Sequence, residues 1–318
     1  MASWTPIPHK ITSRSLSSMH IFDRQAKLKQ KARVIETDTE KSRLTDYLRQ
    51  EVACALVDRL VDIRRKFSEV VEFGAGAGSL VKELTEYGLD RIILTDSSKE
   101  MLWRDHALDP PGVAIDRVVM DEESVRFERS SQDCIMSCLS LHWVNDLPGT
   151  LTQINHSLKP DGVFIGAILG GDTLFELRTS LQLAEQERQG GISPHISPMT
   201  DSRSMSSLIN RAGFSIPTID NDELTVRYPS MFELMDDLKF MGESNAIINR
   251  PTYLRRDTLL AASSIYKSMY GSPTEPGIPA TFQIIYFIGW KADSSQPKPM
   301  ERGSAQHSLK ELGTTSDL

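Results

Sequence analysis

The segment Glu72–Ser79 combines residue types that could hold a charged ligand. Three glycines alternate with small residues, at Gly74, Gly76 and Gly78, and Glu72 stands two positions before the first of them. Glycine lets the chain turn sharply and lets a ligand press against backbone amides. The dinucleotide fingerprint G-x-G-x-x-G would require glycine or alanine at position 79, where this chain has Ser79. A carboxylate at this spacing helps to orient the loop or meets an ammonium group of the ligand. The pattern therefore disfavours a phosphate-bearing dinucleotide, which would gain little from Glu72.

Further acidic residues follow the next two β-like runs. Asp96 comes directly after Ile92–Thr95, and Asp121 and Glu122 come after Arg117–Met120. A carboxylate at the end of the second strand can accept hydrogen bonds from both hydroxyls of a ribose, and the acids after the third could reach an adenine amino group. Each acid alone could be a helix cap or a solvated turn, but their shared position at successive strand ends predicts an adenosyl cofactor. The predicted cofactor-binding residues are Glu72, Gly74, Ala75, Gly76, Gly78, Asp96, Ser97, Asp121, Glu122 and Ser140.

The elements that must position these residues alternate along the chain from about Phe67. The alternation of short β-like runs with helical stretches predicts an α/β fold with a parallel sheet covered by helices. Further strands are expected at Val70–Phe73, Cys134–Leu139, Val163–Leu169 (after a turn at Lys159–Gly162), Leu224–Arg227 and Phe282–Trp290. Later helices are expected at Thr173–Gln189, Ser202–Ala212, Met231–Met241 and Arg256–Tyr270.

The two ends of the chain differ from this central part. Apolar residues recur every four positions at Leu44, Leu48, Val52 and Leu56 and predict an N-terminal helical region over 19–66. The first 18 residues lack acidic residues and are rich in serine, which suits a mitochondrial transit peptide or a plain disordered N-terminus. The core domain is expected over 67–290, with a helical insertion at about 171–212, and residues 291–318 are expected to form a polar, disordered tail.

Composition excludes several classes of protein. A formal net charge of −7 over 318 residues argues against a dedicated nucleic-acid binder. Three cysteines are too few, and odd in number, for a secreted disulfide framework. Cys134 and Cys138 lie in an apolar segment and are interpreted as buried small side chains, so no metal site is predicted. No apolar run reaches the roughly 18 residues that a membrane span needs.

Longer motifs carry a resemblance to a known family. Glu72–Ser79, Asp96, Asp121–Glu122 and Ser140–Pro148 resemble class I methyltransferases of the subfamily that contains the malonyl-carrier-protein methyltransferase of biotin synthesis. More specific stretches are similar to the mitochondrial complex I assembly factor 5 family; they are Lys159–Ala167, Gly170–Leu174, Ser193–Pro198, Met231–Met235, Met241–Asn245 and Glu301–Ala305. The resemblance runs from about His20 to Gly313. One departure is in the loop, where the family commonly has Cys and Arg at the positions of Ala75 and Ala77.

The resemblance implies a class I methyltransferase fold, Rossmann-like, with a seven-stranded, mostly parallel sheet, flanking helices and an N-terminal helical extension. The implied cofactor is S-adenosylmethionine. The implied location is the mitochondrial matrix, where the protein could contact the inner membrane peripherally. The implied role is in complex I assembly, where the enzyme hydroxylates an arginine of an iron–sulfur subunit near the quinone site and meets other assembly factors. The alternatives are an O-methyltransferase acting on a carrier-protein-bound carboxylate and a non-catalytic assembly chaperone.

The catalytic candidates lie after the predicted strands. His142 could act as a base and Trp143 could stack on a substrate guanidinium, although both could instead pack the wall of the cofactor pocket. Asp146, Asp172 and His195 are the other polar candidates, and Asp172 could equally cap the helix beginning at Thr173. Hydroxylation also needs an oxidant. None of the seven histidines is followed two residues later by an acid, a common non-haem iron pattern, so the sequence does not identify the oxidant.

Overall fold

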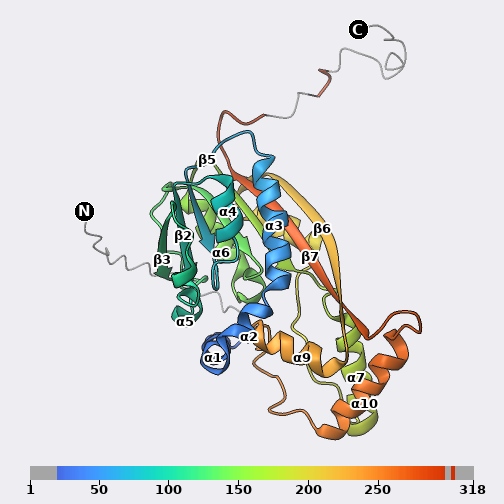
Figure 1. The fold of residues 1–318 in the computed structure, drawn as a ribbon. Helices are drawn as coiled ribbons and strands as arrows, with labels where there is room; N and C mark the ends of the chain where they lie inside the picture. Colours follow the sequence, from blue (N-terminus) through green and yellow to red (C-terminus); the bar gives the residue numbers. More distant parts are fainter. Residues whose placement is uncertain (1–19, 298–301, 305–318) are drawn as a thin grey trace.

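A seven-stranded sheet forms the centre of the protein (Figure 1). The computed structural model describes residues 20–297 and 302–304. The strand order is β3-β2-β1-β4-β5-β7-β6, and only β7 runs antiparallel to its neighbours. This arrangement confirms the expected mostly parallel sheet. The strands are β1 (Glu69–Phe73), β2 (Arg91–Asp96), β3 (Ala114–Val119), β4 (Gln132–Cys138), β5 (Leu158–Leu169), β6 (Phe214–Tyr228) and β7 (Ile278–Lys291).

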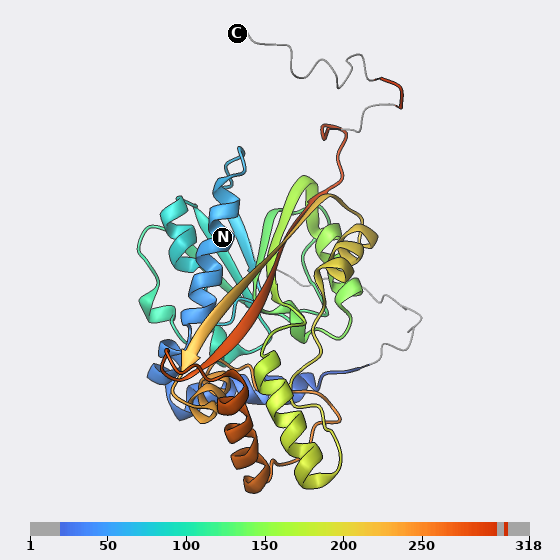
Figure 2. The same ribbon diagram turned by 90° about the vertical axis from the view of Figure 1, so that its right-hand side faces the viewer.

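Helices cover both faces of the sheet and gather at one end of it. In Figures 1 and 2, α1, α7, α9 and α10 lie together beyond one end of the strands. The helices are α1 (Arg24–Thr37), α2 (Thr39–Leu44), α3 (Tyr47–Val61), α4 (Val81–Tyr87), α5 (Lys99–Leu102), α6 (Leu147–Ser157), α7 (Phe175–Gln189), α8 (Ser202–Arg211), α9 (Met231–Phe240) and α10 (Arg256–Tyr270), with short 3₁₀ turns η1 (His106–Leu108) and η2 (Leu141–Trp143). In the described part of the chain, no helix is long and apolar enough to cross a membrane.

Two hydrophobic cores sandwich the sheet. Adjacent residues of a strand point to opposite faces, so Val70 packs in the core beneath α3 and α4, whereas Val71 packs in the core beneath α6 and α8. Leu56 of α3 and Ile154 of α6 are fully buried on the two sides. Burying a side chain of this size contributes about 2 kcal/mol. The two cores fix the sheet and therefore the edge at which the strands β1 to β4 end.

Three strand predictions need correction. β3 spans Ala114–Val119 rather than Arg117–Met120. β6 spans Phe214–Tyr228, far beyond the predicted Leu224–Arg227, because it is an edge strand whose exposed acidic residues hide its extended pairing with β7. The predicted Lys159–Gly162 turn lies inside β5, where the register against β4 shifts and Asp161 adopts a φ of 60°.

The N-terminal helical region also differs from expectation. The spacing predicts Leu44 on the buried face of one continuous helix. In the structure the helix is interrupted at Thr45 and Asp46, so Leu44 is the last residue of α2 and is 78% exposed. Leu48, Val52 and Leu56 are buried as expected. The segments 1–18 and most of 291–318, expected to be a transit peptide and a polar tail, lie outside the described residues.

Candidate functional site

The loop after β1 has the backbone that its glycines allow. Gly74, Gly76 and Gly78 have φ of +69°, +59° and +93°, values that side chains rarely tolerate. A Cβ atom at position 74 would lie 2.1 Å from the Ser140 hydroxyl oxygen, so this loop also needs glycine for its close approach to the segment after β4. The Ala75 amide donates to the Thr95 carbonyl at 2.8 Å and ties the loop to β2. The result is a sharp turn at the carboxyl end of β1, held by hydrogen bonds of its own amides to β2 and within the loop.

Glu72 presents a buried carboxylate to this loop. Its Oε1 accepts hydrogen bonds from the Ser79 hydroxyl at 2.9 Å and the Leu80 amide at 3.2 Å. Its Oε2 has no hydrogen-bond partner among the described residues. Burial raises the pKa of Glu72 to about 7, against the lowering effect of the two donors. A buried carboxylate oxygen without a partner, beside a glycine loop, fits the ammonium group of S-adenosylmethionine.

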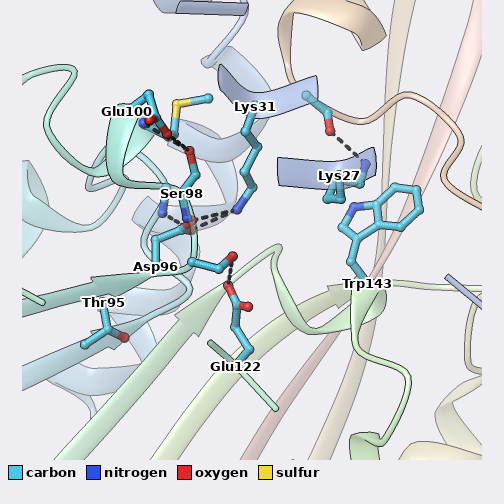
Figure 3. A network of polar contacts seen from close by, with 12 residues as sticks. Lys27, Lys31, Thr95, Asp96, Ser98, Glu100, Glu122 and Trp143 are labelled. Atoms are coloured by element: carbon cyan, nitrogen blue, oxygen red, sulfur yellow. Dashed lines mark hydrogen bonds and ion pairs between the residues drawn. The ribbon is translucent and has the colours of Figure 1, made fainter. Parts of the chain in front are cut away.

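Asp96 lies at the end of β2 with both oxygens engaged (Figure 3). It accepts from the amides of Gly76 at 2.9 Å and Ser98 at 2.7 Å, and from the Lys31 ammonium at 3.0 and 2.9 Å. Burial alone would raise the pKa of Asp96, but Lys31 and the two amides lower it below its ordinary value. Asp96 is therefore an ionised, fully buried acceptor at the predicted ribose position.

The acids after β3 lie close to Asp96. The Ser97 hydroxyl donates to Glu122 Oε1 at 3.2 Å. The Arg24 guanidinium bonds to Asp121 Oδ1 at 2.7 Å and forms a second ion pair with Glu122. The structure thus brings the side chains that are predicted to bind the ribose and the adenine to one edge of the sheet, as the strand order requires.

The sequence interpretation missed the basic residues that meet these acids. Arg24, Lys27 and Lys31 are spaced by three and four positions, which places them on one face of α1. Lys27 lies over the Trp143 ring, with its ammonium 3.2 Å from the ring centroid, and Figure 3 shows Lys31 and Lys27 reaching toward Asp96 and Trp143. The basic stripe in the sequence could have revealed such a face, but not what it meets.

A buried network links the segment after β4 to the loop after α9. The Glu243 carboxylate accepts from Trp143 Nε1 at 2.7 Å and from Arg49 Nη2 at 2.5 Å, and its Oε2 lies 3.1 Å from His142 Nε2. Burial lowers the pKa of His142, although Glu243 opposes this shift. Burial alone would raise the pKa of Glu243, but His142 and Arg49 lower it. A neutral His142 then donates from Nε2, and its Nδ1 has no partner among the described residues. This geometry is compatible with both predicted roles of His142, as a general base and as part of the wall of the cofactor pocket.

Asp146 and Asp172 have other contacts. The Asp146 side chain accepts from the Gly149 amide at 2.9 Å and caps α6. Asp172 accepts from Gln283 Nε2 at 3.2 Å. The interpretation of Asp172 as a helix cap is wrong, because α7 begins at Phe175 and its N-cap position is Leu174. Neither contact reaches the predicted cofactor edge.

A cavity of about 340 Å³ lies between α7, α9 and the segments 195–199 and 243–254. It lies on the side of the catalytic candidates Trp143 and His195, here called the acceptor side because a substrate would approach there. Its walls are mainly aliphatic, and its ionisable lining residues are His195, Glu243, Arg250 and Tyr253. His195 is held by Glu185, with 3.0 Å between Nε2 and Oε2. Trp143 lines both this cavity and a cavity of about 20 Å³ beside Ser97, Glu122 and Ser140. Another cavity of about 340 Å³ runs along Ala75 and Ala77–Ser79.

The cysteines and other ligating side chains show no clustering. Cys134 and Cys138 are buried in β4, as expected for small core side chains, and Cys54 is exposed. Within 20–297 and 302–304, no group of three or more His, Cys, Asp or Glu side chains is arranged to hold a metal ion.

Solved structures share the fold. The YcgJ protein from Bacillus subtilis has a TM-score of 0.53 at 15% sequence identity, covering 76% of this chain and 99% of that protein. The protein BH2331 from Bacillus halodurans C-125 has a TM-score of 0.54 at 12% identity, with the same coverage of both chains. At these identities the likeness concerns the fold alone.

Sequence comparisons identify the family. The methyltransferase domain family matches residues 45–218. The mouse protein named "Arginine-hydroxylase NDUFAF5, mitochondrial" is 48% identical over 309 residues, which cover 96% of this chain and 88% of that protein. The human protein of the same name is 47% identical, with 96% and 87% covered. The malonyl-[acyl-carrier protein] O-methyltransferase of Halorhodospira halophila is more distant, 28% identical over 81% of this chain and 86% of that protein. The chain therefore belongs to the family of the arginine-hydroxylase NDUFAF5 proteins, which is built on a methyltransferase domain.

Proposed function

We propose that this protein is a mitochondrial arginine hydroxylase of complex I assembly that binds S-adenosylmethionine at the Glu72–Ser79 loop. The names of relatives that are nearly half identical over almost the whole chain support the activity and the mitochondrial location. We further propose the matrix, in peripheral contact with the inner membrane, as its place, and an iron–sulfur subunit of complex I and other assembly factors as its partners.

One observation carries the proposal: Trp143 is a common wall of the cofactor edge and of the apolar cavity on the acceptor side. A substrate side chain in the larger cavity would therefore end next to the cofactor. The aliphatic walls suit the methylene stem of an arginine. Among the described residues, Glu243 is the single acidic one that lines this cavity, and its carboxylate is an acceptor for a guanidinium. Glu243 already binds the guanidinium of Arg49.

The residues of this chain have binding and orienting roles in this scheme. Glu72, the glycine loop and Asp96 would hold the cofactor, and Trp143 and Glu243 would orient the substrate. When bound, S-adenosylmethionine supplies an electrophilic methyl group on a sulfonium. Hydroxylation instead converts a C–H bond to C–OH and removes two electrons from the substrate. If molecular oxygen is the source, a separate donor supplies two further electrons and the second oxygen atom leaves as water.

Mass spectrometry of the candidate subunit tests the proposal. Subunit isolated from cells with the intact gene should contain an arginine one oxygen atom heavier, and subunit from knockout cells should contain the unmodified arginine. Re-expression of the wild type should restore the oxygen, and re-expression of Glu243→Ala should not. An arginine that keeps its oxygen in the knockout would contradict the proposal.

Methyl transfer to a carrier-protein carboxylate is the second candidate. The malonyl-carrier-protein methyltransferase relative and the methyltransferase domain favour it. Incubation of the purified protein with S-adenosylmethionine and malonyl-carrier protein would yield a methyl ester in that case.

A non-catalytic chaperone role is the remaining alternative. Full rescue of complex I assembly by a Glu243→Ala protein that folds but leaves the arginine unmodified would favour this chaperone role instead.

A further inference from the structure

Helix α1 places a row of basic side chains on the predicted adenosine end of the cofactor site. Lys31 bonds to Asp96, and Arg24 bonds to Asp121 and Glu122. Lys27 donates to the carbonyls of Gly242 at 2.8 Å and Ser244 at 3.0 Å. Lys27 and Lys31 both belong to α1, and Figure 3 shows where their side chains lie. These contacts join residues far apart in the sequence, so they depend on where α1 docks.

The hydrogen-bonding capacity of Asp96 is fully used in this arrangement. An ionised carboxylate offers about four lone-pair sites. Oδ1 accepts from the Ser98 amide and from Lys31, and Oδ2 accepts from the Gly76 amide and from Lys31. The two amides belong to the loops that shape the site, so Lys31 is the donor that can leave. A ribose diol needs the two lone pairs that Lys31 holds, and the two donors therefore compete.

The space under α1 leads to the same conclusion. The cavity bounded by Arg24, Lys27 and Lys31 has a volume of only about 20 Å³, which is room for about one water molecule. The cavity along Ala75 and Ala77–Ser79 is far larger, at about 340 Å³. The glycine-loop end of the site is thus open, whereas the end at Asp96 and Glu122 is closed.

We propose that α1 is an ionic cover of the adenosine end of the cofactor site, and that S-adenosylmethionine binds by displacing Lys31 and Arg24 from the carboxylates. This inference rests on the proposed function, because it takes S-adenosylmethionine to be the ligand. The closed arrangement lowers the measured affinity below that of the open site, since only the open fraction can bind. A partner that pulls α1 away would raise the affinity for the cofactor, and one that pins α1 down would lower it.

The variant Lys31→Met tests the cover, because methionine keeps much of the side-chain stem and removes the charge. Lys29→Met is the matched control: Lys29 lies on the exposed side of the same helix and carries the same charge. In calorimetric titration with S-adenosylmethionine, Lys31→Met should bind about ten- to hundredfold more tightly than the wild type, the range for loss of a hydrogen bond to a charged group. Lys29→Met should bind like the wild type.

The same substitution should destabilise the ligand-free protein, although it strengthens cofactor binding. Lys31→Met leaves the buried Asp96 carboxylate without its cation, so the melting temperature should fall without cofactor and recover when cofactor is added. A purely structural lysine would lower the melting temperature without any gain in affinity. That combination would overturn the cover.

The outcomes separate this inference from the proposed function. Binding by the wild type with no gain in Lys31→Met overturns the cover and leaves the cofactor assignment standing. Absence of binding in the wild type and in both variants overturns the cofactor assignment together with the cover. If Lys31→Met does not fold, Arg24→Met should show the same gain, because Asp121 is half exposed and the buried Glu122 keeps the Ser97 hydroxyl as a donor. In the wild type, added cofactor should also speed amide hydrogen exchange in α1, and unchanged or slower exchange overturns the cover.

Discussion

The buried carboxylate of Glu72 predicts that cofactor affinity depends on pH. Its pKa is about 7 in the ligand-free protein because burial disfavours the charged form. A cofactor ammonium at Oε2 needs the ionised form, so binding must release the proton. Glu72 is about nine-tenths protonated at about pH 6 and about one-quarter protonated at about pH 7.5. The affinity for S-adenosylmethionine should therefore rise about eightfold between these values, or about 1.3 kcal/mol.

The assay is calorimetric titration at the two pH values with two variants. Glu72→Gln should bind more weakly and lose the pH dependence. Glu86→Gln removes a carboxylate from the exposed side of the neighbouring helix α4 and should keep the eightfold change. Equal affinity of the wild type at both pH values, or an eightfold change that persists in Glu72→Gln, would refute the assignment of the ammonium to Glu72.

The same pKa has a consequence for stability. The folded pKa of about 7 lies above the unfolded value of about 4.5. The folded state therefore binds the extra proton, and the stability that protonation supplies is present below the unfolded pKa and is lost as pH rises through 7. Between about pH 5.5 and about pH 8.5, the wild type should lose about 2 kcal/mol more unfolding free energy than Glu72→Gln. Urea denaturation measures this difference.

Further predictions concern the loop, the buried network and the sheet. Gly76→Val forces a branched side chain to a φ of +59° and should cost about 1–3 kcal/mol in thermal unfolding and abolish calorimetric binding of S-adenosylmethionine; unchanged affinity in the folded variant would contradict the site. Glu243→Gln removes the counter-ion of the largely buried Arg49 and should cost about 3 kcal/mol in urea denaturation, whereas an unchanged midpoint would show that the pair is dispensable. Gly166→Ala places a Cβ atom 2.2 Å from the Phe287 ring between β5 and β7 and should lower stability by about 1–3 kcal/mol, which a melting curve would detect.

Sequence alone determined the features that depend on residues close together in the chain. The glycine spacing of 74, 76 and 78 requires a tight turn, and alternating strands and helices require a parallel sheet. Because parallel strands end at one edge, Glu72, Asp96 and Glu122 could be assigned to that edge before any coordinates were known. Local signals failed where the chain is polar and extended, as in β6, whose acidic exposed positions mask its pairing with β7.

Tertiary structure decided which side chains meet. His142 and Glu243 are 101 residues apart, and Lys31 and Asp96 are 65 residues apart, yet each pair is in contact. No periodicity in the sequence encodes these distances, because they follow from how α1 and the loop after α9 dock onto the strand ends. A buried carboxylate needs a partner, but the sequence does not say which cation supplies it. Burial of Asp96, docking of α1 and competition for the Asp96 lone pairs are properties of the folded chain. They are the reason why α1 covers the edge of the sheet at which the sequence predicts the cofactor.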